Sequence, residues 1–260
     1  MRRIATAALA VLLSIVVPAA GQELGITQAP VQNPDEPPAR THSDKVVVSK
    51  DPNLAPAIGP SPAKVRVLVF SDFQCPVCAR LPPATHQIAE EFPGGVRLEF
   101  HQMPLKMHRN AENAAVAALA AHRQGKFWEM HDLLFQNQAR LDEGSLPGYA
   151  RQIGLDMAKF TKDYADPAVR KRAVDERTLG EALGADGTPA IFVNGKPTIG
   201  WASWAALRGQ VEMEINAANG LIGKGTKLAD VEAIRAKGNL GDDTKWKAYK
   251  AGIIDKSPKK

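Results

Sequence analysis

Apolar residues follow two different spacings along the middle of the chain. Residues 64–70 (KVRVLVF) are β-branched and almost continuously apolar, which is typical of a buried strand. Residues 96–101 (VRLEFH) follow a Gly-Gly turn and predict a second strand. Residues 188–194 predict a third strand, and Asn194-Gly195 predicts a hairpin turn that leads into a fourth over residues 196–199.

Helical spacing fills the intervals between these strands. Residues 75–92 carry apolar side chains at helical spacing, but they include Pro82-Pro83, which must kink or break the helix because a proline nitrogen cannot donate a hydrogen bond. A long block over about residues 106–183 is helical in pattern, and Asp166-Pro167 predicts the start of its last helix. Residues 201–219 predict a further helix. Strands that alternate with helices favour an α/β fold.

The first 62 residues show a different pattern. Residues 1–21 combine a basic start, Met1-Arg2-Arg3, with an apolar core over residues 9–17 and small residues after it, which is the layout of a secretory signal peptide. The apolar core is shorter than a membrane span requires. Residues 22–62 are rich in proline and predict an extended linker, with a short edge strand at residues 46–48. We therefore expect an exported protein, periplasmic or similarly placed, in a compartment where disulfides form and persist.

Composition and charge then narrow the classes of partner. The chain has 260 residues, of which 44% are hydrophobic, so it can bury a sizeable core. A net charge of +5 alone would suggest a nucleic-acid or membrane-surface partner. The excess lies in residues 220–260, where ten Lys and Arg oppose five Asp and Glu. We predict a solvated basic extension there, with a short helix that places Leu228, Val231 and Ile234 on one face. A more specific hypothesis is that this extension makes weak contact with an anionic membrane surface. No nucleic-acid partner is expected.

The candidate chemistry lies in Cys75-Pro76-Val77-Cys78. These two cysteines, the only ones in the chain, stand where a strand gives way to a helix. Unpaired backbone N–H groups and the helix dipole at such a junction stabilise a thiolate, so Cys75 is the expected nucleophile. Cys78 is the expected resolving thiol, which closes the ring after a mixed disulfide has formed. Pro76 is tolerated because the first helical N–H needs no partner.

Two other uses of the cysteine pair agree less well with the sequence. A structural zinc ion needs four ligands, and the folded region offers no second C-x-x-C and no H-x-x-x-H. The five histidines of the folded region are dispersed along it: His86, His101, His108, His122 and His131. We expect His101 and His108 to be structural. A structural disulfide across so small a loop would stabilise little. The sequence therefore favours redox exchange, with no metal ion and no cofactor.

Two motifs together resemble a known family. Residues 67–78 (VLVFSDFQCPVC) and residues 187–195 (GTPAIFVNG), with a helical block between them, resemble the DsbA-like branch of the thioredoxin-fold thiol-disulfide oxidoreductases. The resemblance implies that Thr188 and a cis Pro189 flank the active-site sulfurs, and that Thr188 backbone groups pair with an extended substrate. It makes Pro76 and Val77 part of the active-site loop.

The resemblance also implies a division of the chain. We expect a thioredoxin-like α/β fold with an inserted α-helical domain. Its parts are a first thioredoxin-like segment over residues 63–104, a helical insertion over residues 105–182 and a second thioredoxin-like segment over residues 183–219.

The function implied is exchange of disulfides with cysteine-containing client proteins, as an oxidase whose pair is reoxidised by a quinone-linked membrane partner. A disulfide reductase or isomerase, and a non-catalytic peptide-binding or chaperone module, are the alternatives. Two departures from the family pattern bear on this. Val69 stands where many members carry a buried carboxylate that takes the proton of the resolving thiol, which leaves Asp72 as the nearest acid. Val77 stands where strongly oxidising members have histidine, so we expect a less extreme potential.

Overall fold

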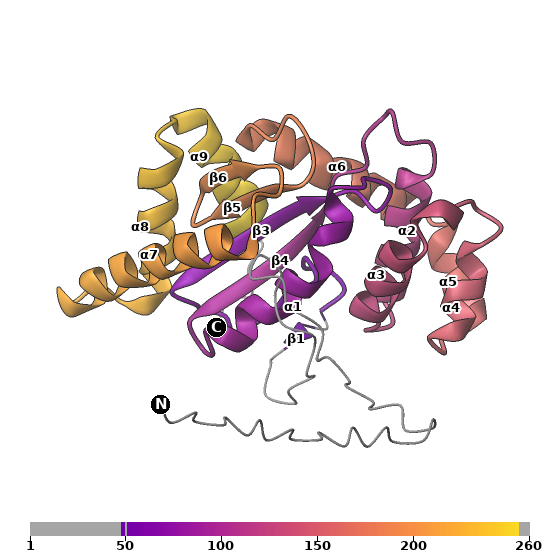
Figure 1. The fold of residues 1–260 in the computed structure, drawn as a ribbon, viewed down its shortest axis with the longest axis horizontal. Coiled ribbons are helices and arrows are strands. Elements are labelled where there is room, and N and C mark those ends of the chain that lie inside the picture. The colour runs from indigo at the N-terminus through magenta and orange to yellow at the C-terminus, as the bar shows by residue number, and fades with distance from the viewer. Residues whose placement is uncertain (1–47, 50, 255–260) are drawn as a thin grey trace, which may run out of the picture. The chain divides into compact units, whose positions relative to one another are not determined.

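A computed structural model describes residues 48–49 and 51–254 of the chain, shown in Figure 1. The predicted signal peptide, residues 1–21, and residues 22–47 of the predicted linker lie outside the described residues. A mixed sheet of six strands, in the order β1-β2-β4-β3-β5-β6, runs through the described part. Only β3 and β4 are parallel to each other; the other neighbours are antiparallel. The strands are β1 (Val48–Ser49), β2 (Ala57–Ile58), β3 (Val65–Ser71), β4 (Val96–Gln102), β5 (Ala190–Val193) and β6 (Lys196–Ile199).

Helices cover both faces of the central strands, which explains why β3, β4 and β5 are apolar or buried throughout. On one face, α1 (Pro82–Glu91) and α7 (Trp204–Gly223) pack with the helical insertion into the larger core cluster. On the other face, α6 (Pro167–Leu183) packs with two C-terminal helices, α8 (Leu228–Leu240) and α9 (Asp243–Tyr249). Within the described residues, no helix is both long and apolar enough to cross a membrane.

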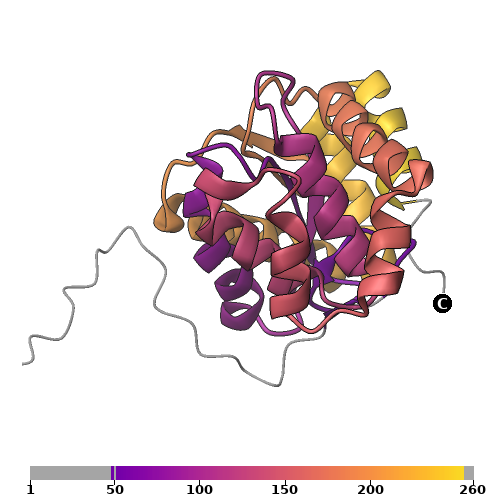
Figure 2. The same cartoon turned by 90° about the vertical axis from the view of Figure 1, so that its right-hand side faces the viewer.

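The helical insertion follows β4 and returns the chain to β5. Figure 2 views the molecule from the side of this insertion. Its helices are α2 (Ala111–His122), α3 (Phe127–Gln136), α4 (Leu146–Gln152), α5 (Met157–Tyr164) and α6. Asp156 and Asp166 begin the last two of them, each accepting a hydrogen bond from a backbone N–H of the first turn. The predicted thioredoxin-like fold with an inserted helical domain is confirmed.

The active-site helix is broken where Pro82-Pro83 predicts it. Cys78–Arg80 form a single 3-10 turn, and α1 begins at Pro82, with the two prolines occupying the positions where a missing N–H costs least. The cysteine motif therefore lies in a separate short turn, rather than in the first turn of a continuous helix over residues 75–92.

The prediction of an extended linker up to residue 62 is wrong for its last part. Ala57 and Ile58 are buried and pair antiparallel with β4, and the N–H of Phe100 donates to the Pro56 carbonyl at 2.9 Å. The strand was concealed by the prolines around it, which lie on either side of the two paired residues and so interrupt no bond to β4. The edge strand predicted at residues 46–48 shares only Val48 with β1, since residues 46–47 are not described.

The prediction of a solvated C-terminal extension is wrong for residues 228–253. Tyr249 of α9 is fully buried, and Ala236 of α8 and Ile253 are buried with it against Phe70 and Phe192 of the sheet. The helix face predicted to be apolar is not the face that packs. Leu228 and Ile234 are 36% and 48% exposed, whereas Ala236 is buried. The apolar face of β3 and β5 must be buried by other elements. The hydrophobic pattern of α8 alone does not show that α8 packs against this face.

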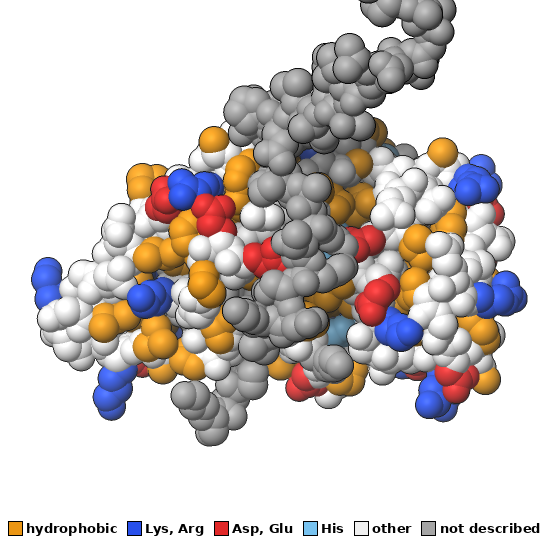
Figure 3. Space-filling model, turned by 60° about the horizontal axis from the view of Figure 1, so that its bottom comes forward, with side chains coloured by type: hydrophobic (Ala, Val, Ile, Leu, Met, Phe, Trp, Pro, Cys, Tyr) orange, Lys and Arg blue, Asp and Glu red, His pale blue; other side chains and the backbone are white. Residues whose placement is uncertain are grey.

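A buried ion network fixes these helices to the sheet. Arg66 of β3 pairs with Glu99 of β4 and with Glu232 of α8, both at 2.7 Å. Burial opposes ionisation of Glu99, but Arg66 and Arg97 outweigh it and hold the pKa of Glu99 well below its usual range. On the described surface in Figure 3, Lys and Arg groups are scattered among Asp, Glu and apolar groups. Among the described C-terminal bases, Arg235, Lys237, Lys245 and Lys247 lie on the packed helices α8 and α9. The face in Figure 3 shows no concentrated basic patch among its described residues.

Candidate active site

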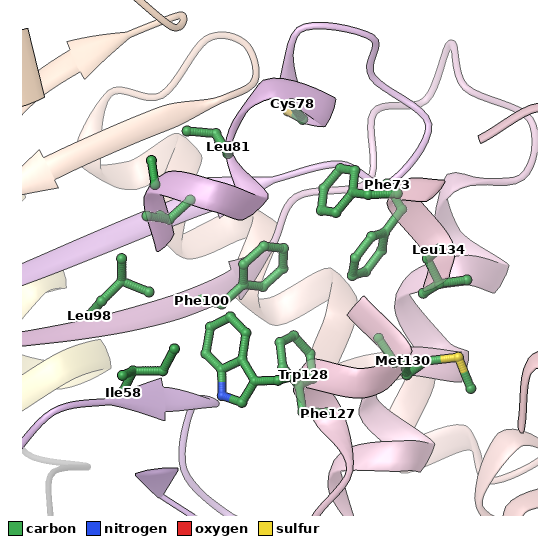
Figure 4. Close-up of a cluster of buried hydrophobic side chains, with 14 of the residues drawn as sticks. Ile58, Phe73, Cys78, Leu81, Leu98, Phe100, Phe127, Trp128, Met130 and Leu134 are labelled. Carbon is green, nitrogen blue, oxygen red and sulfur yellow. The ribbon is translucent and has the colours of Figure 1, made fainter. Parts of the chain in front are cut away.

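Both cysteines follow directly on the end of β3. A turn closed by the Cys75 N–H and the Asp72 carbonyl, at 3.1 Å, leads the chain from the strand into the motif. Cys75 is 6% exposed and Cys78 is completely buried, while Pro76 and Val77 between them face solvent. Figure 4 shows Cys78 beside Leu81 at the edge of the apolar cluster that contains Phe73 and Phe100. The two sulfurs are free thiols, one near the surface and one in the core.

The second motif meets the first across a long sequence separation. Thr188 and Pro189 are joined by a cis peptide bond directly before β5. The Cys75 thiol donates to the Thr188 carbonyl at 3.4 Å. The structure thus brings Thr188 and Pro189 next to the cysteine motif, residues 75–78.

The two thiols have opposite acidities. The Cys78 thiol donates a hydrogen bond to Cys75, and this outweighs the effect of partial burial. The Thr188 side chain and the backbone N–H groups of Cys78 and Val77 add to it, and together they lower the pKa of Cys75 to about 5. Burial, and the same bond to Cys75, raise the pKa of Cys78 well above the usual value. At neutral pH, Cys75 is a thiolate and Cys78 is a thiol.

This acidity gives a direct prediction for the reduced protein. The rate of alkylation of Cys75 by iodoacetamide should rise with pH through a midpoint near 5 and stay level to pH 8, because only the thiolate reacts. In the Cys78→Ala variant the main hydrogen-bond donor is lost, so the midpoint should move upward. A wild-type midpoint near that of a free thiol, about 8.5, would contradict the geometry described here.

Asp72 organises the active-site loop. Its buried carboxylate accepts hydrogen bonds from the N–H of Gln74 at 2.7 Å and from the N–H of Leu105 at 2.8 Å, and it shares one with His108 Nδ1 at 2.7 Å. The carboxylate therefore joins the cysteine loop to the loop that follows β4. His108 has the structural role expected of it. His101 is buried and stacks on Phe70, with 4.8 Å between ring centroids.

Gln138 also supports the loop and has no signal in the sequence. Its side-chain amide donates to the carbonyls of Phe73 and Cys75 at 2.8 and 2.9 Å, from a 3-10 turn over Gln138–Arg140 in the helical insertion. A single glutamine, more than sixty positions from the motif, belongs to no recognisable pattern. The insertion thus stabilises the backbone of the loop that carries the cysteines.

One group of side chains could offer three ligand atoms to a metal ion within the described part of the chain. His86 of α1 and His131 and Asp132 of α3 place one ligand atom each within 4.8 Å of one another. An Asp132 carboxylate oxygen lies 2.9 Å from His131 Nδ1, at hydrogen-bond distance, and 3.5 Å from His86 Nε2. The two helices bring them together, which the spacing of the histidines along the chain does not show. Neither cysteine belongs to this group.

A family model described as Thioredoxin matches residues 53–213, more than half of the chain. The chain belongs to the thioredoxin family. Its helical insertion lies between β4 and β5, where the resemblance to DsbA-like proteins implies one. The match ends before α8 and α9, so two of the helices that cover the second face of the sheet lie outside the family region.

Solved structures share this fold. A thioredoxin-like oxidoreductase from Silicibacter pomeroyi DSS-3 is 31% identical, with a TM-score of 0.56 over 63% of this chain and 92% of that one. The thiol-disulfide exchange protein alpha-DsbA2 from Wolbachia pipientis is 22% identical, with a TM-score of 0.56 over 61% of this chain and 86% of that one. BdbD from Bacillus subtilis is 21% identical, with a TM-score of 0.55 over 62% and 93%. The last two similarities concern the fold.

Among curated proteins, the matches are to part of much longer chains. The Na(+)/H(+) antiporter NhaA 1 of Salinispora arenicola is 37% identical over 152 residues, which is 58% of this chain and 23% of the antiporter. NhaA 3 of Salinispora tropica is 36% identical over the same length and the same shares. The chain thus spans less than a quarter of the length of these relatives.

Proposed function

We propose that this protein is an exported thiol-disulfide oxidoreductase that oxidises cysteine-containing client proteins through Cys75 and Cys78. The observation that carries the proposal is the divided acidity of the pair, with an acidic thiol near the surface and a completely buried, weakly acidic thiol behind it. Disulfide exchange needs this difference in acidity, because the Cys75 sulfur must react with the client while the Cys78 thiol stays unreactive until the mixed disulfide has formed.

The reaction runs from the oxidised pair. A client thiolate attacks the Cys75 sulfur, the bond between Cys75 and Cys78 breaks, and Cys78 leaves and takes up a proton. A second client thiolate then attacks the client sulfur of the mixed disulfide, and Cys75 leaves as a thiolate. The client loses two electrons to the pair. The low pKa of Cys75 makes it a good leaving group and stabilises the reduced enzyme, which favours the oxidase direction.

The surface around Cys75 suits an extended client. Val77 and Met107 are 40% and 82% exposed. Met107 belongs to the loop that Asp72 holds against the cysteine motif through Leu105 and His108. Exposed apolar side chains bind unfolded segments, and the Thr188 backbone beside the sulfur would pair with a client strand.

Further partners belong to this proposal. A quinone-linked membrane protein would return the pair to the disulfide state, and export to the periplasm or a similar compartment would supply the reduced clients. Weak contact with anionic membranes through the C-terminal residues stays a prediction. It requires vesicle binding that falls as salt rises.

The reduction potential of the pair tests the direction of electron flow. Equilibration against glutathione should give a potential above that of thioredoxin, about −270 mV, and the oxidised protein should transfer its disulfide to a reduced client. Val77 leaves room for the alternative, a reductase or isomerase, because it supplies no charge to stabilise the thiolate. A potential at or below that of thioredoxin would favour the alternative and exclude the oxidase role.

A further inference from the structure

We propose that Ser71 and Gln102 form an internal proton relay for Cys78, in place of the carboxylate that Val69 replaces. Ser71 is the residue whose hydroxyl stabilises the Cys78 thiolate, and Gln102 is a positioning residue beside it. The inference rests on the proposed exchange function, because it concerns the step in which Cys78 loses or regains its proton.

Neither residue that the sequence offers can fill this place. Val69 is 1% exposed and contributes only apolar contacts to the cluster that contains Cys78. Asp72 is buried, but Gln74, Leu105 and His108 occupy its two oxygens. A carboxylate that already holds the loop together by three hydrogen bonds has little capacity left for a proton from Cys78.

Ser71 and Gln102 lie side by side at the ends of two strands. They are the last residues of β3 and β4 and face each other in the parallel register. Side chains alternate between the faces of a sheet, so both point to the same face as Val69 and Phe100. This is the face of the cluster in Figure 4, where Cys78 lies above Phe100.

Their polar atoms are buried and unsatisfied. Ser71 is 1% exposed and Gln102 is not exposed at all. Ser71 Oγ and both side-chain amide atoms of Gln102 have no hydrogen-bond partner among the described residues. Buried polar groups normally find a partner, and a buried water with two to four polar neighbours is the usual solution. We infer a water held between this serine and this glutamine.

The Ser71 hydroxyl also acts on Cys78 itself. Burial raises the pKa of the Cys78 thiol, and a hydrogen bond from Ser71 works against it by stabilising the thiolate. The hydroxyl is thus a donor without a partner in the thiol state that gains one when Cys78 ionises. That is the property needed beside a sulfur that must become a nucleophile for a short time.

The step balances without a buried acid. With a client attached to Cys75, the Cys78 thiol gives its proton to the water held by Ser71 and Gln102, and this water passes a proton on to solvent in the same step. The Cys78 thiolate attacks the Cys75 sulfur, the new bond joins Cys75 and Cys78, and the bond from Cys75 to the client breaks. The client sulfur leaves as a thiolate and takes a proton from solvent. In the oxidising direction the same steps run in reverse.

Rapid mixing of the reduced protein with a small disulfide peptide tests the relay. Formation of the mixed disulfide depends on peptide concentration, whereas its resolution by Cys78 is a first-order step that can be followed from pH 5 to 10. In Ser71→Ala, resolution at pH 7 should slow about tenfold or more and its pH midpoint should rise, since a hydrogen bond to a charged group is lost. Ser71→Thr, which keeps the hydroxyl, should restore the profile, and Gln102→Leu should slow resolution several-fold.

The outcomes separate the relay from the exchange function. The alkylation profile of Cys75 should be the same in Ser71→Ala/Cys78→Ser as in Cys78→Ser, because the relay acts on Cys78 alone. If resolution in Ser71→Ala follows the wild-type pH profile, or if Ser71→Thr is as slow as Ser71→Ala, the relay is wrong while exchange stands. If the wild-type protein forms no mixed disulfide at all, the proposed function itself fails.

Discussion

Replacing Cys75 by serine should reduce disulfide transfer to a reduced client by a factor on the order of a thousand or more, to the uncatalysed background. A serine oxygen is of similar size but forms no disulfide, so neither the mixed disulfide nor the internal disulfide can exist. The fold should survive, because Cys75 lies at the rim of the core with 6% of its surface exposed. Oxidative refolding of a reduced client, or reduction of insulin in the reverse direction, measures the loss.

The matched control is Cys78→Ser. It keeps the acidic sulfur at Cys75 and its position beside Thr188, so it should still form a mixed disulfide with clients and fail only to release them. Normal activity in Cys75→Ser would remove the enzyme interpretation and leave a non-catalytic peptide-binding or chaperone module with a thioredoxin fold.

The second large effect concerns stability rather than chemistry. Tyr249→Ala should lower the free energy of unfolding by about 3–5 kcal/mol, the usual cost of truncating a buried aromatic side chain. Tyr249 is fully buried, its ring stacks with Trp246 at 6.2 Å between centroids, and its hydroxyl donates to Glu232 at 3.1 Å. Urea unfolding, followed by circular dichroism, gives the difference.

Tyr249→Phe is the control for the ring alone. It removes only the hydroxyl and should cost about 1 kcal/mol, the net worth of a typical hydrogen bond. If Tyr249→Ala changed stability by less than about 0.5 kcal/mol, as a surface substitution does, α9 would be a solvated extension after all. The expected loss would establish the C-terminal helices as part of the folded unit, although they lie beyond the family region.

The sequence predicts the central elements well because each has a local cause. The apolar run before Cys75 must be buried on both faces, and it forms β3, with the cysteines directly after its end. Asn194 and Gly195 both take positive φ, of 44° and 79°, which the hairpin between β5 and β6 requires. These signals lie within a few residues of the structure that they specify.

What the sequence misses depends on contacts between distant segments. β2 is two residues long and exists because β4 offers it an edge, so no local pattern could reveal it. Gln138 and Gln102 are ordinary glutamines in the sequence, and only the fold places one on the carbonyls of the cysteine loop and the other beside Ser71. The sequence offers Asp72 as the nearest acid, and its three hydrogen bonds show that it holds the loop.

Trapping the covalent intermediate tests the central claim most directly. The Cys78→Ser variant, incubated with oxidised client or with cell-envelope proteins and then digested, should give client peptides joined to Cys75 by a disulfide, identified by mass spectrometry. The adducts should disappear on reduction and be absent from Cys75→Ser/Cys78→Ser. Failure of Cys75 to form any mixed disulfide, under conditions in which its thiolate reacts with iodoacetamide, would contradict the account.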